Sequence, residues 1–90
     1  MTEPRVTVKV TDMDSERTRL AQKLAIDFLR SGEKNEKALA KHLKQQFDKS
    51  FRPKWHCVVG ANFGSHVTHK SNDFLFFFVD NRGILLFRTT

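Results

Sequence analysis

The side chains best suited to chemistry are four histidines and one cysteine, because imidazole and thiolate are natural ligands for zinc and copper. Their spacing argues against a metal site. His66 and His69 are three residues apart in a predicted strand, so their side chains point to opposite faces, and the neighbours His56 and Cys57 diverge for the same reason. We therefore expect no metal in this protein.

Catalysis by a cysteine needs a thiolate beside a base and an orienting third group. Cys57 instead lies between His56 and Val58 in an apolar strand, which indicates a packed, inert thiol. The chain also has no serine elbow, no paired carboxylates and no phosphate loop. Gly60 and Gly64 lack the third glycine and the following helix of a dinucleotide site, so they are interpreted as turn residues. We expect neither an enzyme nor a cofactor.

The positive charge is concentrated in one stretch of the chain. Sixteen Lys and Arg against ten Asp and Glu give a net charge of +6, and residues 33–54, with seven bases and three acids, supply +4 of it. Such a stretch can attract an acidic protein, a nucleic acid or an anionic membrane, or can be a solvated helix face. Binding of nucleic acid by a sheet would need aromatics interleaved with bases, whereas the phenylalanines here are contiguous. No nucleic acid partner is expected.

The elements that position these residues follow from apolar periodicity. Residues 5–10 alternate polar and apolar, which predicts a strand with Val6, Val8 and Val10 on its buried face. Capping oxygens and acids at residues 11–16 then precede a helix that ends near Ser31 and Gly32. Its apolar positions recur at helical spacing: Leu20, Ala21, Leu24, Ala25 and Phe28.

A second helix is predicted from a cap at Asn35 to Phe51, where Arg52 and Pro53 stop it. Four short strands follow, rich in β-branched and aromatic residues, and turn residues at positions 60–64, 71–73 and 80–83 separate them. These strands are predicted at residues 55–59, 65–69, 74–79 and 84–87. The order β-α-α-β-β-β-β predicts an α+β domain in which two helices pack on a mainly antiparallel five-stranded sheet.

The strand Phe74–Val79 lacks alternation, so both of its faces must be covered. One face can meet the helices, and the other needs a second subunit or a ligand. Ninety residues make one domain, 1–90, with a modest core. The lone cysteine favours a reducing compartment, and neither a signal sequence nor a membrane-length apolar run is found, so a cytoplasmic protein is expected.

Several motifs occur together and in order, and in combination they are specific. They are Phe47-Asp48-Lys49, Pro53, Trp55-His56-Cys57-Val58-Val59-Gly60, Asn62-Phe63-Gly64-Ser65, Val67-Thr68-His69 and Ile84-Leu85-Leu86-Phe87. The chain from about Val6 to Arg88 thereby resembles the eight-kilodalton cytoplasmic dynein light chain family.

The resemblance implies a homodimer in which the strand around Ser65 to His69 crosses over to join the sheet of the other subunit. It further implies two identical grooves between that strand and the second helix, where a partner segment adds as another antiparallel strand. Main-chain pairing would set the register, and side-chain pockets would select the sequence. The implied partners are dynein intermediate chains and other proteins with short linear motifs, often centred on glutamine.

Carried over position by position, the resemblance assigns the groove to three sets of residues. Its backbone donors and acceptors are expected from Asn62, Phe63, Gly64, Ser65, His66, Val67, Thr68 and His69. Phe63, Val67, Phe74, Phe76 and Phe78 should form the apolar walls. Glu36 and Lys37 begin the second helix, where free backbone amides can receive the glutamine side chain and Lys37 would reach across the groove mouth.

The dimer interface is expected to contain His56, Ser65, His66 and Val67. His56 corresponds to a family histidine that faces its twin across the dimer axis, and two imidazoles there cannot both become charged cheaply. Acidification is therefore predicted to weaken the dimer. The alternative for His56 is a merely buried strand histidine.

This sequence departs from the family pattern near the groove. His66, Phe76 and Phe78 stand where tyrosines are usual, Ala61 replaces a frequent arginine, and one extra residue lies within residues 31–35. The lost hydroxyls remove hydrogen-bond partners, so peptide preference can differ. Two hypotheses remain open: a light chain that serves a dynein motor, and a divergent adaptor of a specialised cytoskeletal or membrane-associated complex without a motor role.

Overall fold

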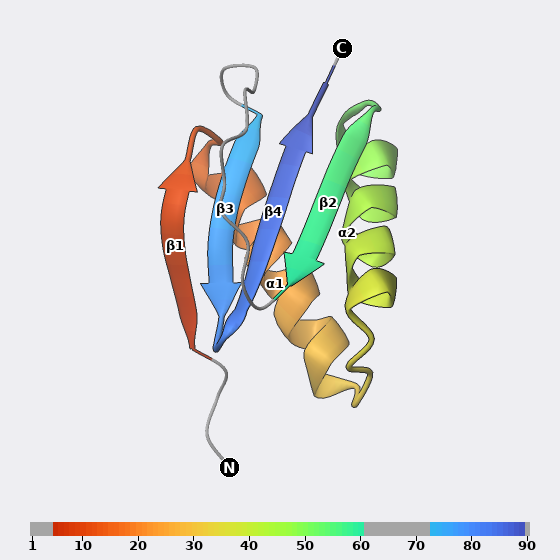
Figure 1. Cartoon of the computed structure of the whole chain (residues 1–90). Helices are drawn as coiled ribbons and strands as arrows, with labels where there is room; N and C mark the ends of the chain where they lie inside the picture. The colour runs from red at the N-terminus through yellow and green to blue at the C-terminus, as the bar shows by residue number, and fades with distance from the viewer. Residues whose placement is uncertain (1–4, 61–72, 90) are drawn as a thin grey trace.

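The computed structural model describes residues 5–60 and 73–89, which form two helices and four strands. In chain order these are β1 (Val6–Thr11), α1 (Ser15–Arg30), α2 (Glu36–Phe51), β2 (Trp55–Gly60), β3 (Phe74–Val79) and β4 (Arg82–Arg88). The strands make one sheet in the order β1-β3-β4-β2, and each neighbouring pair is antiparallel. Both helices cover the same face of the sheet (Figure 1), which confirms the predicted α+β architecture.

Local capping explains where both helices begin. The Asp14 carboxylate accepts a hydrogen bond from the Arg17 amide at 2.9 Å, and the Asn35 side chain accepts from the Ala38 amide at 3.1 Å. Each cap satisfies an amide that has no acceptor within its helix. The predicted cap at Asn35 and the predicted end of the second helix at Phe51 are both confirmed.

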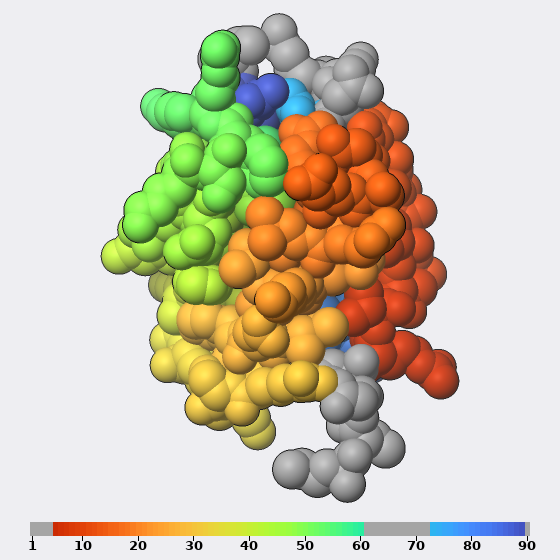
Figure 2. All heavy atoms as spheres, turned by 180° about the vertical axis from the view of Figure 1, so that it is seen from behind, coloured from red at the N-terminus to blue at the C-terminus, as the bar shows by residue number. Residues whose placement is uncertain are grey.

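The core lies between the helices and the sheet. It contains apolar residues that the sequence predicts at helical spacing in both helices, and every second residue of the strands. Its largest fully buried side chains are Trp55, Phe47, Phe77, Leu39, Leu43, Leu75, Ile84, Leu86 and Val79. The Phe47 and Trp55 rings meet edge to face with centroids 4.9 Å apart, so the contact locks α2 onto β2. Figure 2 shows the helical side of the molecule, where the side chains of α1 and α2 cover much of the surface.

The prediction for the first strand was wrong about burial. Val8 and Val10 are 39% and 50% exposed, and only Val6 is partly buried. The pairing of β1 with β3 shifts register between Val8 and Val10, so Val10 lies opposite Phe76 instead of continuing the alternation. β1 is also an edge strand, and a bulge of this kind bends an edge strand and disrupts its regular pairing.

The C-terminal strands agree with the prediction where the structure describes them. β2, β3 and β4 cover the predicted strands, and β3 joins β4 through a tight turn at Asp80 and Asn81, with Val79 paired to Arg82. The predicted strand at residues 65–69 lies outside the described residues, so the sheet described has four strands instead of five, and strand exchange stays a prediction. Neither helix is long and apolar enough to cross a membrane.

Candidate functional site

The face of the sheet turned away from the helices is apolar. Leu75, Phe77 and Val79 point into the core, so the alternation of β3 places Phe74, Phe76 and Phe78 on the opposite side. The pairing of β3 with β4 extends this surface, because Phe87 lies opposite Phe74 and Leu85 lies opposite Phe76. We call this surface the outer sheet face, and it comprises Val58, Phe74, Phe76, Phe78, Leu85 and Phe87.

Exposure varies across the outer sheet face. Phe74 and Leu85 are buried, Phe76 and Phe78 are half-buried, and Val58 is 46% exposed. The rings of Phe76 and Phe78 are tilted against each other with centroids 5.3 Å apart. The three predicted groove phenylalanines of β3 therefore share one face. An apolar face of this kind is suited to a protein partner.

His56 borders the outer sheet face on β2. It lies opposite Phe87 in the sheet, the two rings stack at 5.3 Å, and its Nε2 atom is 2.9 Å from the Thr89 hydroxyl oxygen. The neighbouring Cys57 faces the helical core, so the predicted divergence of these two side chains is confirmed. Burial raises the pKa of the Cys57 thiol to about 12, and such a thiol is a poor nucleophile.

β2 forms one side of the sheet, because it pairs with β4 and ends the strand order. Within residues 5–60 and 73–89 no strand pairs with its other edge. An edge of this kind carries backbone donors and acceptors at strand spacing, which another extended segment can use. The helix α2 packs directly behind β2, so this edge lies beside a helix.

The start of α2 is the other predicted part of the groove. The Ala38 amide is already capped by Asn35, and the Leu39 amide donates to the Asn35 carbonyl at 3.0 Å. The amides of Glu36 and Lys37 have no acceptor among the described residues, as expected for the first turn of a helix. Two donors therefore remain for a ligand there.

Glu36 has a role that sequence reasoning missed. Its carboxylate lies 3.4 Å from Arg82 Nε, which ties the start of α2 to the start of β4. The Glu36 side chain is 43% exposed, so the pair is weak. No sequence signal connects two residues 46 positions apart.

The predicted groove residues do not all meet within one chain. Glu36 and Lys37 begin α2, which lies on the helical side of the sheet (Figure 1). Strand alternation instead places Phe74, Phe76 and Phe78 on the outer sheet face. The remaining predicted residues, Asn62, Phe63, Gly64, Ser65, His66, Val67, Thr68 and His69, lie outside the described residues. Their roles in the groove and in the dimer stay predictions.

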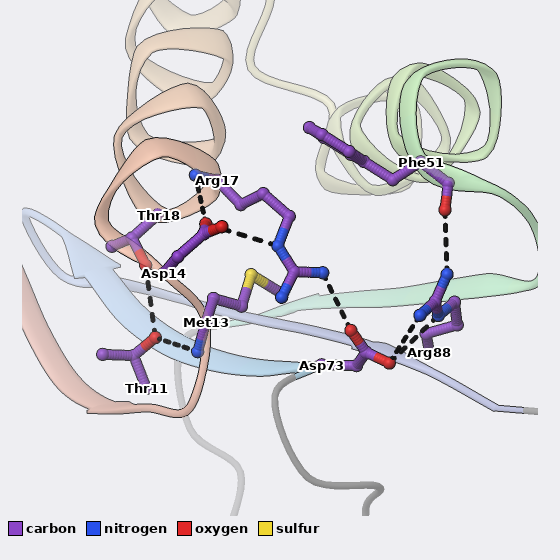
Figure 3. A network of polar contacts seen from close by, with 8 residues as sticks. All are labelled: Thr11, Met13, Asp14, Arg17, Thr18, Phe51, Asp73 and Arg88. Atoms are coloured by element: carbon purple, nitrogen blue, oxygen red, sulfur yellow. Dashed lines mark hydrogen bonds and ion pairs between the residues drawn. The ribbon is translucent and has the colours of Figure 1, made fainter.

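A buried ion network that the sequence analysis missed anchors β3. Asp73, which lies in the turn predicted at residues 71–73, is 8% exposed. Its carboxylate accepts from Arg17 Nη1 at 2.8 Å and from Arg88 Nη2 and Nε at 2.8 and 3.1 Å (Figure 3). Arg88 also donates to the Phe51 carbonyl at 2.8 Å, so the network joins α1, β3, β4 and the end of α2.

The charges around Asp73 stabilise its ionised form. Burial alone would raise the pKa of Asp73, but hydrogen bonds and charges from Arg17 and Arg88 outweigh it and hold that pKa below its ordinary value. The two guanidinium groups lie 5.9 and 5.4 Å from the ring of Trp55, within cation–π distance. Two cations thus share one carboxylate and one indole, and their role is to fix the position from which β3 begins.

Solved structures define the class of protein to which this fold belongs. The dynein light chain-like domain of the Fasciola hepatica calcium binding protein FhCaBP2 superposes with a TM-score of 0.82 at 20% identity, over 100% of this chain and 95% of that domain. The dynein light chain-like domain of CsTAL3 gives a TM-score of 0.77 at 21% identity, over 93% and 92% of the two chains. The fold is that of a dynein light chain.

The sequence itself places the chain in the family. The dynein light chain type 1 family matches residues 5–89. A dynein light chain of Schistosoma mansoni is 37% identical over 89 residues, which cover 99% of each chain. The chain therefore belongs to the dynein light chain family, and the resemblance found in its motifs is confirmed.

Proposed function

We propose that this protein is a non-enzymatic, homodimeric adaptor that binds linear peptide segments by strand addition in two symmetric grooves. The observation that carries the proposal is the edge of β2, which has no strand partner among the described residues and lies beside α2 and the apolar outer sheet face. An exchanged strand on this edge would extend the sheet, and a peptide would extend it once more.

Dimerisation would cover the outer sheet face. Val58 is exposed and Phe76 and Phe78 are half-buried, so a second copy of this face supplies matching apolar surface across a two-fold axis. Two grooves per dimer make the adaptor bivalent. It can align two copies of a partner chain and raise the effective concentration of whatever each copy carries.

The proposed partners are dynein intermediate chains and other cytoplasmic or cytoskeletal proteins with glutamine-centred motifs. The amides of Glu36 and Lys37, which have no acceptor among the described residues, provide two donors for a glutamine side-chain oxygen, and Lys37 is exposed at the same helix turn. These features support, in this chain, the groove role expected of the start of α2.

The test is titration of a glutamine-containing light-chain-binding peptide, with the mass of the protein measured by light scattering in the same buffer. We expect a dimer with two sites. Lys37→Ala should weaken binding about fivefold, as for one partly exposed polar contact, while Lys41→Ala, one helical turn further, should leave it unchanged. A stable monomer, or equal effects of the two substitutions, would contradict the proposal.

A second candidate is a divergent adaptor with no motor role. His66, Phe76 and Phe78 replace the usual tyrosines, which favours an altered motif. The Fasciola hepatica protein, named a calcium binding protein, shows that this fold also occurs as a domain of other proteins. A dimer that ignores glutamine-centred peptides but selects another motif from a peptide panel would favour this candidate.

A further inference from the structure

The exposed side of α2 carries a row of positive charge of which the proposed groove uses only the first residue, Lys37. Lys37, Lys41, Gln45 and Lys49 are all exposed and are spaced four residues apart, so they lie along one side of the helix. We call this row the α2 stripe. It points away from the core, which α2 contacts through Leu39, Leu43 and Phe47.

The charge of the α2 stripe is not neutralised within the described residues. The helix has two acids of its own, and both are paired elsewhere: Glu36 with Arg82 and Asp48 with Lys44. None of the three lysines of the stripe has an ion pair with a described residue. Exposed Lys34 and Arg52 extend the positive charge beyond the two ends of the helix.

The composition of this surface narrows the class of partner. The large apolar side chains exposed among the described residues are Val8, Val10 and Val58, all on strands, so the stripe has no apolar anchor for a lipid bilayer. It also has no aromatic ring on which a nucleic acid base could stack. Its bases are lysines, which act as point charges and do not form the bidentate fork with which arginine selects phosphate.

The spacing of the stripe fits an extended chain of carboxylates. Residues four apart in a helix rise about 6 Å, and two residues of an extended chain cover about 6.7 Å. A peptide with acids at alternate positions can therefore place one carboxylate beside each successive member of the row. From Lys37 to Lys49 the row is about 18 Å long, which matches a short segment of such a peptide.

We propose that the α2 stripe, which begins at the groove with Lys37 and continues beyond it, is a second binding surface for an acidic, extended polypeptide segment. The attraction is electrostatic between exposed groups, so binding is weak for each contact, rapid and sensitive to salt. In a dimer the surface would occur twice.

The experiment measures binding of a labelled peptide of alternating glutamate and serine by fluorescence anisotropy, at about 50 mM and about 200 mM salt. The double variant Lys41→Glu/Lys49→Glu should lose at least about tenfold in affinity, since two attractive contacts become repulsive. Lys41→Arg/Lys49→Arg keeps the charge and should bind as the parent does. Lys37 is left intact because it is assigned to the groove.

The matched control is Arg5→Glu/Lys9→Glu, which also reverses two exposed charges, directly before and on β1, at the side of the sheet opposite to β2 and α2. If the control variant keeps its affinity for the acidic peptide, the site is local to the α2 stripe. If it loses as much affinity as the double variant, the effect comes from net charge alone and the inference is overturned. Vesicles of anionic lipid and a DNA duplex are titrated in parallel, and binding of either as tight as that of the peptide would also overturn it. Unchanged binding of the glutamine-containing peptide by the double variant separates this surface from the groove.

Discussion

Asp73 and Arg88 are joined twice, once through the backbone and once through their side chains. The Arg88 amide donates to the Asp73 carbonyl at 3.1 Å, and the Arg88 guanidinium places Nη2 and Nε at 2.8 and 3.1 Å from one carboxylate oxygen. The first residue before β3 is thereby fixed to the last residue of β4. Arg17 holds the other carboxylate oxygen.

Loss of the Asp73 charge should destabilise the fold. In Asp73→Asn, Arg17 and Arg88 remain partly buried without their counter-charge, so we expect the free energy of unfolding to fall by about 3 kcal/mol, at the lower end for a broken buried pair because Arg88 keeps some solvent contact. Urea denaturation measures the change. Asp27→Asn, an exposed carboxylate on α1, is the control and should stay within about 0.5 kcal/mol. Equal stabilities of the two variants would contradict the role given to the network.

The same carboxylate should make stability sensitive to acid. The pKa of Asp73 is lowered in the folded protein, since hydrogen bonds from two arginines outweigh the effect of burial. Its stabilising effect is therefore fully present above the unfolded pKa of about 3.9 and is lost as the pH falls through the lower folded value. We expect the unfolding free energy to decline below about pH 4.

Urea denaturation at a series of pH values tests this slope. Asp73→Asn cannot titrate at that position, so its stability should fall less steeply on acidification. Some slope should remain, because Asp48 also has a lowered pKa: burial opposes the shift, but hydrogen bonds from Lys44 and the Trp55 amide outweigh it. Parallel curves for the parent and Asp73→Asn would show that Asp73 is not coupled to folding.

The parts of the fold that local chemistry determines were predictable from the sequence. Asn35 supplies a cap three residues before the amide it accepts from, and Arg52 and Pro53 end α2 directly, so the limits of that helix needed no tertiary information. Val10 shows where this approach stops. Its alternation predicts burial, but a bulge in β1 changes the register, and the bulge becomes apparent only through the pairing with β3.

The candidate site was predictable to a similar degree. The shared face of Phe74, Phe76 and Phe78 follows from strand alternation alone. The ion pairs of Asp73 were not predictable, because its partners, Arg17 and Arg88, are 56 and 15 positions away. Ion pairs between residues far apart in the chain leave no periodic pattern in the sequence. The motifs at residues 62–69 identify the family, but their geometry lies outside the described residues.

Cys57 should be nearly unreactive in the folded protein. Burial raises the pKa of its thiol to about 12, so almost no thiolate is present near neutral pH. We expect a disulfide reagent that releases a coloured thiol to label the native protein far more slowly than the same protein in urea, where the thiol is free. Val58→Cys provides the control, because that neighbouring position is 46% exposed and should react rapidly in a Cys57→Ala background. Fast labelling of native Cys57 would contradict its placement in the core.

Acidification should dissociate the proposed dimer before it unfolds the chain. His56 borders the outer sheet face, stacked on Phe87 and hydrogen-bonded to Thr89, and in the expected dimer it faces its twin. Two adjacent imidazolium groups would repel each other across the interface, which disfavours the dimer in acid; the range to test is about pH 7 to about pH 4. Sedimentation velocity over this range should therefore show the dimer giving way to monomer.

His56→Gln separates this effect from unfolding. Glutamine can still hydrogen-bond to the Thr89 hydroxyl but cannot become charged, so this variant should remain dimeric at pH values where the parent dissociates. Circular dichroism on the same samples should show folded protein throughout, because the loss of stability that comes from Asp73 begins only below about pH 4. A parent dimer whose mass does not change, or equal dissociation of parent and variant, would leave His56 as a packed strand histidine with no part in controlling assembly.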